Sequence, residues 1–172
     1  MEIELERTFL LKSLPPGLSK CEKREITDVY YPKGAVHPVL RLRKDGDRHE
    51  LTKKEPVVEG DASHQLEQTI TLTKAEFLAL SRLPGKELHK IRYHYPHEGK
   101  TAQIDVFQGA MKGLALVDFE FRTLQEKMAF RMPSFCLAEV TQEEFLAGGM
   151  LCGKKYADIA AKLAVFGYRK AL

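Results

Sequence analysis

Alternating polar and apolar residues run through most of this chain and predict a protein built mainly of β-strands. Side chains on a strand point to opposite faces at a period of two, so each such segment has one polar and one apolar face. Turns rich in proline, glycine and aspartate separate the segments. The eight predicted strands span residues 2–11, 26–31, 38–44, 49–54, 64–72, 87–95, 101–108 and 114–122.

Short helices interrupt and follow these strands. Thr73, Thr123 and Thr141 each precede a glutamate by three residues, which is the sequence signature of a capping box at a helix start. An amphipathic helix is predicted over residues 154–166. We therefore expect a single domain over residues 1–172, with a helical C-terminal segment at about 141–172.

The polar faces of the strands are sorted by charge. Glu2, Glu4 and Glu6 alternate along the first strand and share one face, where like charges repel unless a cation covers them. Carboxylates recur at polar positions of three later strands, and cations occupy those of three others. The acidic positions are Glu67, Asp105, Asp118 and Glu120, and the basic ones are Arg41, Arg43, Lys54, Lys90 and Arg92.

Two interpretations of this sorting compete. In the first, each polar face is the solvated side of a half-buried sheet, and for any single strand this is favoured. In the second, all polar faces line one shared interior, and the repeated pairs of like charge two residues apart favour it. We therefore expect an α+β fold in which eight antiparallel strands close into a barrel with a polar lumen, flanked by short helices. Such a lumen suits a polyanion on its cations and a divalent metal on its carboxylates.

The order of these motifs resembles the triphosphate tunnel metalloenzymes, the superfamily of the CYTH domain. The motifs are Glu4-Leu5-Glu6 followed by Phe9-Leu10, Leu40-Arg41-Leu42-Arg43-Lys44-Asp45-Gly46, Leu51-Thr52-Lys53-Lys54, Lys90-Ile91-Arg92-Tyr93, Ile104-Asp105-Val106-Phe107 and Leu116-Val117-Asp118-Phe119-Glu120-Phe121. The short bacterial inorganic tripolyphosphatases are similar in length and in strand motifs. The resemblance implies an eight-stranded tunnel that binds a triphosphate end-on and hydrolyses it with Mg²⁺ or Mn²⁺.

Phosphoryl transfer depends on neutralised phosphate oxygens and a well-placed nucleophile more than on covalent chemistry. We expect the substrate to be bound by Arg41, Arg43, Lys54, Lys90 and Arg92. The expected catalytic carboxylates are Glu4, Glu6 and Glu120. The expected metal ligands are Glu4, Glu6, Asp118 and Glu120, with Glu2, Glu67 and Asp105 as further candidates.

One position departs from the family pattern. The lysine that follows the two family glutamates falls at Thr8 in this chain, and a threonine donates a hydrogen bond but carries no charge. Hydrolysis of inorganic tripolyphosphate is the leading prediction. The alternatives are a nucleoside or thiamine triphosphatase, an adenylate cyclase on the same fold, and a polyphosphate- or nucleotide-binding module without turnover, which the absence of the lysine favours.

Composition adds little to this picture. Among 172 residues, 27 Lys and Arg face 24 Asp and Glu, and the net charge of +3 is too small to favour nucleic acid as a partner. Three widely spaced cysteines without a CxxC motif indicate reduced thiols and a cytoplasmic protein. The charged N-terminus and the lack of a long apolar run predict neither a signal peptide nor a membrane partner. The oligomeric state is left open.

Overall fold

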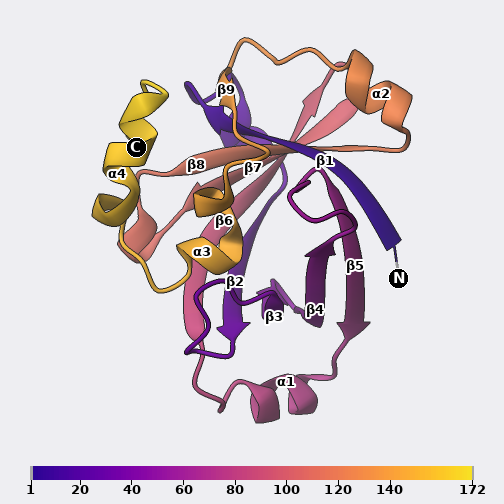
Figure 1. The fold of residues 1–172 in the computed structure, drawn as a ribbon, viewed down its shortest axis with the longest axis vertical. Helices are drawn as coiled ribbons and strands as arrows, with labels where there is room; N and C mark the ends of the chain where they lie inside the picture. Colours follow the sequence, from indigo (N-terminus) through magenta and orange to yellow (C-terminus); the bar gives the residue numbers. More distant parts are fainter. Residues whose placement is uncertain (1, 172) are drawn as a thin grey trace.

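A closed β-barrel forms the body of the structure, a computed structural model that describes residues 2–171, with residue 2 described by its backbone alone. Within this part of the chain there are nine strands: Glu2–Leu11 (β1), Lys23–Tyr31 (β2), Leu40–Asp45 (β3), Arg48–Pro56 (β4), His64–Thr71 (β5), Lys86–His97 (β6), Lys100–Phe107 (β7), Ala115–Phe121 (β8) and Cys136–Glu139 (β9). Eight of them follow the order β5-β4-β3-β2-β6-β7-β8-β1, and pairing of β5 with β1 closes the ring. All pairings are antiparallel, so the predicted eight-stranded barrel is confirmed (Figure 1).

The long strand β1 closes the barrel. Along one edge it pairs with β8 from Leu5 to Leu10. Along the other edge its first residues, up to Leu5, pair with β5, and its last residues, Phe9–Leu11, pair with β9. The sequence did not predict β9, because four residues are too few for a periodic pattern to emerge.

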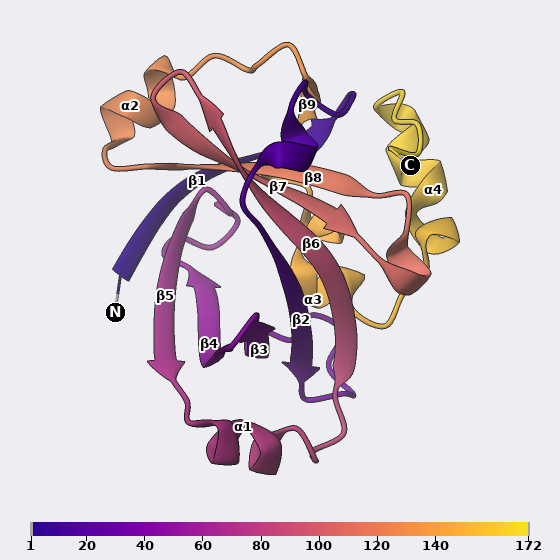
Figure 2. The ribbon, with the colours of Figure 1, turned by 180° about the vertical axis from the view of Figure 1, so that it is seen from behind.

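The helices are short and lie at the ends and on the outside of the barrel (Figures 1 and 2). They are Lys74–Leu80 (α1), Leu124–Ala129 (α2), Gly148–Leu151 (α3) and Tyr156–Val165 (α4), with single 3₁₀ turns at Leu18–Lys20 (η1), Gly109–Met111 (η2) and Glu144–Leu146 (η3). Thr73 forms the predicted capping box with Glu76, and the Thr123 hydroxyl accepts the backbone N–H of Glu126. No helix in residues 2–171 is long and apolar enough to span a membrane.

The predicted helix start at Thr141 is wrong. The Thr141 hydroxyl donates to Glu139 (2.8 Å) and accepts the backbone N–H of Thr8 (3.1 Å), so it is not available as a helix cap. The first helical turn after it is the 3₁₀ turn Glu144–Leu146. The Thr141 hydroxyl bonds residues of β1 and β9 instead of a helix N-terminus, so tertiary contacts outweigh the local preference for a helix cap.

The barrel interior changes from polar to apolar along its length. Leu88, Phe107 and Leu116 occupy the inward positions next to Lys90, Asp105 and Asp118 on their strands. These apolar side chains belong to one buried cluster with Val140 and Leu146. We call residues 140–151 the plug segment, because it covers this apolar end of the interior.

Two glycines allow the plug segment to lie against the barrel. A Cβ atom on Gly148 would lie 2.0 Å from the Tyr30 hydroxyl, and one on Gly149 would lie 2.2 Å from the carbonyl oxygen of Pro38. The second obstacle is backbone and cannot rotate away. Any side chain at residue 149 therefore forces the plug segment outward.

Gly149→Ala should lower the free energy of unfolding by about 1–3 kcal/mol, the usual cost of overpacking a tight contact. Gly34→Ala is the matched control, because nothing lies within 4 Å of a Cβ atom there. The control should stay within about 1 kcal/mol of the wild type. Urea unfolding of the three proteins measures both values, and equal stability of the two variants would show that the plug segment is not held in place by this contact.

Candidate functional site

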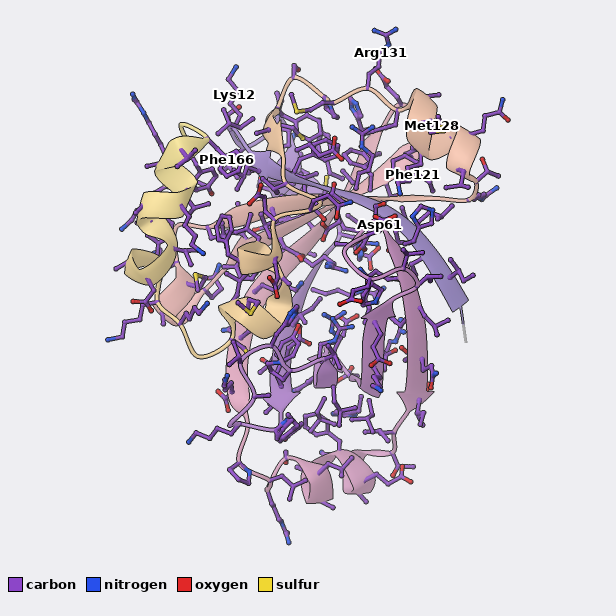
Figure 3. The ribbon with its side chains drawn as sticks, viewed as in Figure 1. Lys12, Asp61, Phe121, Met128, Arg131 and Phe166 are labelled. Atoms are coloured by element: carbon purple, nitrogen blue, oxygen red, sulfur yellow. The ribbon has the colours of Figure 1, made fainter. Side chains whose placement is uncertain are left out.

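A cavity of about 700 Å³ occupies the barrel interior and is lined by residues from all eight barrel strands. Every predicted site residue whose side chain the structure describes lines it: Glu4, Glu6, Arg41, Arg43, Lys54, Glu67, Lys90, Arg92, Asp105, Asp118 and Glu120. The side chain of Glu2 lies outside the described residues. Figure 3 shows nitrogen and oxygen atoms gathered inside the barrel, with Asp61 labelled on the loop between β4 and β5. The polar faces therefore line one shared interior rather than a solvated sheet surface.

Carboxylates cluster where β1 pairs with β8. Glu6 lies directly opposite Glu120, and Thr8 lies opposite Asp118. Directly opposed side chains are near neighbours, and like charges there are unfavourable. Burial raises the pKa of Glu6 and that of Asp118, and nearby acids add to both shifts. This corner of the tunnel therefore has an excess of negative charge that a cation would relieve.

Lys54 provides part of that relief. Its ammonium nitrogen lies 2.8 Å from Glu4 Oε2 and 2.9 Å from Glu6 Oε2. Burial opposes the charge of Lys54, but attraction to Glu6 and Glu4 outweighs burial and raises its pKa above the usual value. Lys54 on β4 thus bridges the two carboxylates of β1 inside the tunnel.

Two buried acids hold the cations on the opposite wall. Asp105 accepts hydrogen bonds from Arg92 Nε and Nη2, both at 2.7 Å, and from Lys90. Asp28 on β2 accepts hydrogen bonds from Arg43 Nε (2.7 Å) and Nη2 (2.8 Å). Both carboxylates are only 1% exposed. Burial opposes ionisation of both, yet the adjacent cations outweigh it, lowering the pKa of Asp105 and bringing the pKa of Asp28 to about 2.

Asp28 was missed by the sequence analysis. Most of the other site residues belong to pairs of like charge two positions apart or lie next to a polar residue at that spacing, but the neighbours of Asp28 at that spacing are Ile26 and Tyr30. Its inward orientation follows only from the register, which places Asp28 opposite Arg43. A single acid among apolar neighbours gives no charge pattern that a sequence can display.

An anion in the cavity would stabilise two cations on this wall, Lys90 and Arg41. Burial lowers the pKa of Lys90 to about 8, although Asp105 offsets part of the effect. Arg41 Nε is buried and has no hydrogen-bond partner among the described residues. Its nearest acidic oxygen, Asp28 Oδ1, is 3.8 Å away. An unpaired buried donor costs free energy until an acceptor reaches it.

The acidic residues differ in how well they suit a divalent metal. In the part of the chain described here, no three Asp, Glu, His or Cys side chains converge as a ready metal site. Glu4, Glu6, Asp118 and Glu120 nevertheless lie on two adjacent strands and offer the oxygen ligands that Mg²⁺ and Mn²⁺ prefer. Lys54 contacts Glu4 and Glu6 at 2.8 and 2.9 Å, so a metal ion on these two carboxylates would have to compete with its ammonium group. Asp105 has both oxygens taken by Lys90 and Arg92, and Glu67 accepts the Thr69 hydroxyl at 2.8 Å.

Thr8 lies on the same inward side of β1 as Glu4 and Glu6. Its hydroxyl donates to Asp118 Oδ1 at 2.7 Å. The nearest cation to that carboxylate is Arg92, whose Nη2 lies 3.7 Å from Asp118 Oδ2. An uncharged donor therefore lies beside Asp118, at the position where the resemblance implies a lysine.

The sequence is 31% identical over 143 residues to the inorganic triphosphatase of Nitrosomonas europaea, covering 82% of this chain and 91% of that protein. The chain belongs to the triphosphate tunnel family. No protein-family model matches it. The crystal structure of the inorganic triphosphatase NE1496 superposes with a TM-score of 0.63 and 25% identity, over 88% of this chain and 95% of that one. A putative adenylate cyclase from Bacillus halodurans shares the fold, with a TM-score of 0.53, 15% identity and coverage of 99% and 93%.

Thr8→Val should destabilise the protein by about 1.5–3 kcal/mol at neutral pH, because a charged acceptor loses its donor without a change of shape. The hydrogen bond favours the ionised form of Asp118 and so lowers its pKa, whereas burial raises it. The stability difference should therefore be largest where Asp118 is ionised and should shrink as the pH falls through its pKa.

Urea unfolding at neutral and acidic pH measures this difference. Thr8→Ser is the control, because it keeps the hydroxyl and should unfold close to the wild type. Equal stability of Thr8→Val and wild type at neutral pH would mean that the hydrogen bond to Asp118 contributes nothing.

Proposed function

We propose that this protein hydrolyses inorganic tripolyphosphate inside the tunnel with the help of Mg²⁺ or Mn²⁺. One observation carries the proposal: a single cavity brings a wall of cations to face the opposed carboxylates Glu6 and Glu120. Cations neutralise the charge of a phosphate chain, and carboxylates are suitable ligands for a divalent ion that also binds the phosphates. The inorganic triphosphatase of Nitrosomonas europaea supports this choice of substrate.

The cationic wall would bind the phosphate oxygens. Arg41 Nε is a buried donor without a hydrogen-bond partner among the described residues. A phosphate oxygen would accept its hydrogen bond and add the attraction of opposite charge. Burial lowers the pKa of Lys90, and a nearby polyanion would favour its protonated form. Arg92 keeps its place through Asp105 and extends the same wall.

The carboxylate corner would hold the metal. Lys54 bridges Glu4 and Glu6 at 2.8 and 2.9 Å, and a phosphate entering the tunnel offers it an alternative anion. Lys54 would then release both carboxylates, which with Asp118 and Glu120 can act as ligands. When bound there, Mg²⁺ or Mn²⁺ supplies charge neutralisation on the phosphate oxygens and a water of lowered pKa.

The polar part of the cavity suits a phosphate chain. The plug segment covers the apolar end of the interior, where Leu88, Phe107 and Leu116 offer no partner to an anion. An organic group would have to remain outside the polar part of the tunnel. Hydrolysis of tripolyphosphate would form a bond between a water oxygen and a terminal phosphorus and break the bridging P–O bond. The products would be orthophosphate and pyrophosphate, which share the protons of the water, and the arginines and lysines would hold the chain.

Thr8 favours a second candidate, a polyphosphate-binding module without turnover. A cation beside the reacting phosphate stabilises the charge that develops in the transition state, and Thr8 offers only a hydroxyl that Asp118 already occupies. Binding depends on Arg41, Lys90 and Arg92 and would survive this loss. Turnover measurements separate the two candidates.

Phosphate release should be fastest with tripolyphosphate, slower with ATP and thiamine triphosphate, and absent in EDTA. Glu6→Gln and Glu120→Gln should each lower turnover by at least about 100-fold, because an amide keeps the shape but removes the charge that holds the metal. Glu22→Gln is the matched control, since Glu22 is exposed and pairs with Arg24 outside the cavity. Its turnover should equal that of the wild type.

Circular dichroism and thermal unfolding show whether the variants keep the fold. Full activity in EDTA would contradict the metal-dependent mechanism. Tight binding of tripolyphosphate without phosphate release would instead favour the binding module.

A further inference from the structure

We propose that Asp28 is a positioning residue that makes the two arginines of β3 unequal: it locks Arg43 in place and leaves Arg41 free to bind phosphate. This inference rests on the proposed function, because it assigns a task to each cation of the same tunnel. Arg41 and Arg43 are indistinguishable in sequence, since both occupy inward positions of one strand.

The geometry separates them. Asp28 lies opposite Arg43 in the β2–β3 register, and its two oxygens accept Arg43 Nε and Nη2 at 2.7 and 2.8 Å. This is the two-pronged contact that fixes a guanidinium in both position and plane. Arg41 Nε lies 3.8 Å from the same Oδ1 atom, beyond hydrogen-bonding distance, and this nitrogen has no hydrogen-bond partner among the described residues. The Nη2 atom of Arg41 lies 3.9 Å from Glu67 Oε2, which is also too far for a hydrogen bond.

The two arginines therefore differ in what they can offer to a phosphate. Arg43 donates two of its five N–H groups to Asp28, and the negative charge of this carboxylate offsets the positive charge of Arg43. Arg41 keeps its Nε donor free. Arg41 is thus the arginine of β3 that binds the phosphate chain, whereas Arg43 forms a fixed part of the wall.

A buried carboxylate in the cationic wall of a polyanion site weakens attraction for the ligand. Asp28 is 1% exposed and next to Arg41 and Arg43, so its charge is poorly screened. Such a residue reduces ground-state affinity, and we assign its benefit to the placement of the cations. Interactions that are fixed in advance favour the transition state over the ground state.

The competing explanation is that Asp28 serves folding alone, as the partner of a buried cation. In that case the loss of Asp28 would lower the stability and the fraction of folded protein. The kcat of the folded fraction would not change, whether or not Arg43 is present. Turnover per binding site and a double-mutant cycle with Arg43 separate these explanations.

The experiment compares wild type, Asp28→Asn, Arg43→Gln and the double variant. Calorimetry gives the affinity and the stoichiometry for tripolyphosphate, and phosphate release gives kcat per bound site. Asp45→Asn is the matched control, because Asp45 lies on β3, pairs with Arg24 at 3.5 Å and does not line the cavity. It removes one carboxylate from the same strand pair and should leave affinity and kcat within about twofold of wild type.

Asp28→Asn should lower kcat at least about 10-fold while its affinity for tripolyphosphate stays equal or becomes tighter, since Arg43 is freed and one negative charge is lost. Arg43→Gln should weaken binding at least about 10-fold, because Asp28 is left unpaired beside the anion. Adding Asp28→Asn to Arg43→Gln should then tighten binding at least about 5-fold, whereas independent substitutions would lower the affinity additively.

Additive losses in this cycle, or a kcat of Asp28→Asn equal to that of Asp45→Asn, would overturn the assignment. If Asp28→Asn alone does not fold, the double variant decides, because it removes both buried charges; binding no tighter than Arg43→Gln would overturn the proposal. A wild type that neither binds nor hydrolyses tripolyphosphate would overturn the proposed function itself, together with this assignment. Wild-type activity combined with additive variants would overturn only the role of Asp28.

Discussion

Pairing of opposite charges inside a closed barrel is the constraint on which the rest of this structure depends. Closing the sheet brings acids and bases from eight strands into one cavity, where an unpaired charge is costly. Each pair links residues that are far apart in the chain or on different strands: Lys54 joins Glu4 and Glu6, Asp105 joins Lys90 and Arg92, and Asp28 joins Arg43. The same contacts that neutralise the cavity therefore also hold the walls in register.

These pairs divide into two kinds. Asp28 and Asp105 are buried and accept several hydrogen bonds each, so they form permanent parts of the cationic wall. The contacts of Lys54 with Glu4 and Glu6 involve side chains that are 20–26% exposed and can exchange partners. An entering polyanion would compete for Lys54 and free the carboxylates for a metal. Phosphate binding would then favour metal binding, and by thermodynamic linkage metal binding would favour phosphate binding by the same factor.

The sequence predicted the barrel and most of its lining because like charges two residues apart, such as Arg41 with Arg43 and Asp118 with Glu120, mark a face that is not simply solvated. Three features escaped prediction for physical reasons. β9 is too short to show a period, Asp28 has apolar neighbours at the informative spacing, and the Thr141 hydroxyl is taken by β1 and β9 rather than by a helix. Each depends on a contact distant in sequence, which no local pattern contains.

The most direct test of the central claim is a crystal structure of the protein with tripolyphosphate. We expect the phosphate chain inside the barrel, with an oxygen within hydrogen-bonding distance of Arg41 Nε and with Lys54 moved from Glu4 and Glu6 to the phosphate. The Asp28–Arg43 and Asp105–Arg92 contacts should remain unchanged. A chain bound outside the barrel, with Lys54 still joined to Glu4 and Glu6, would contradict the exchange of ion-pair partners as the basis of binding.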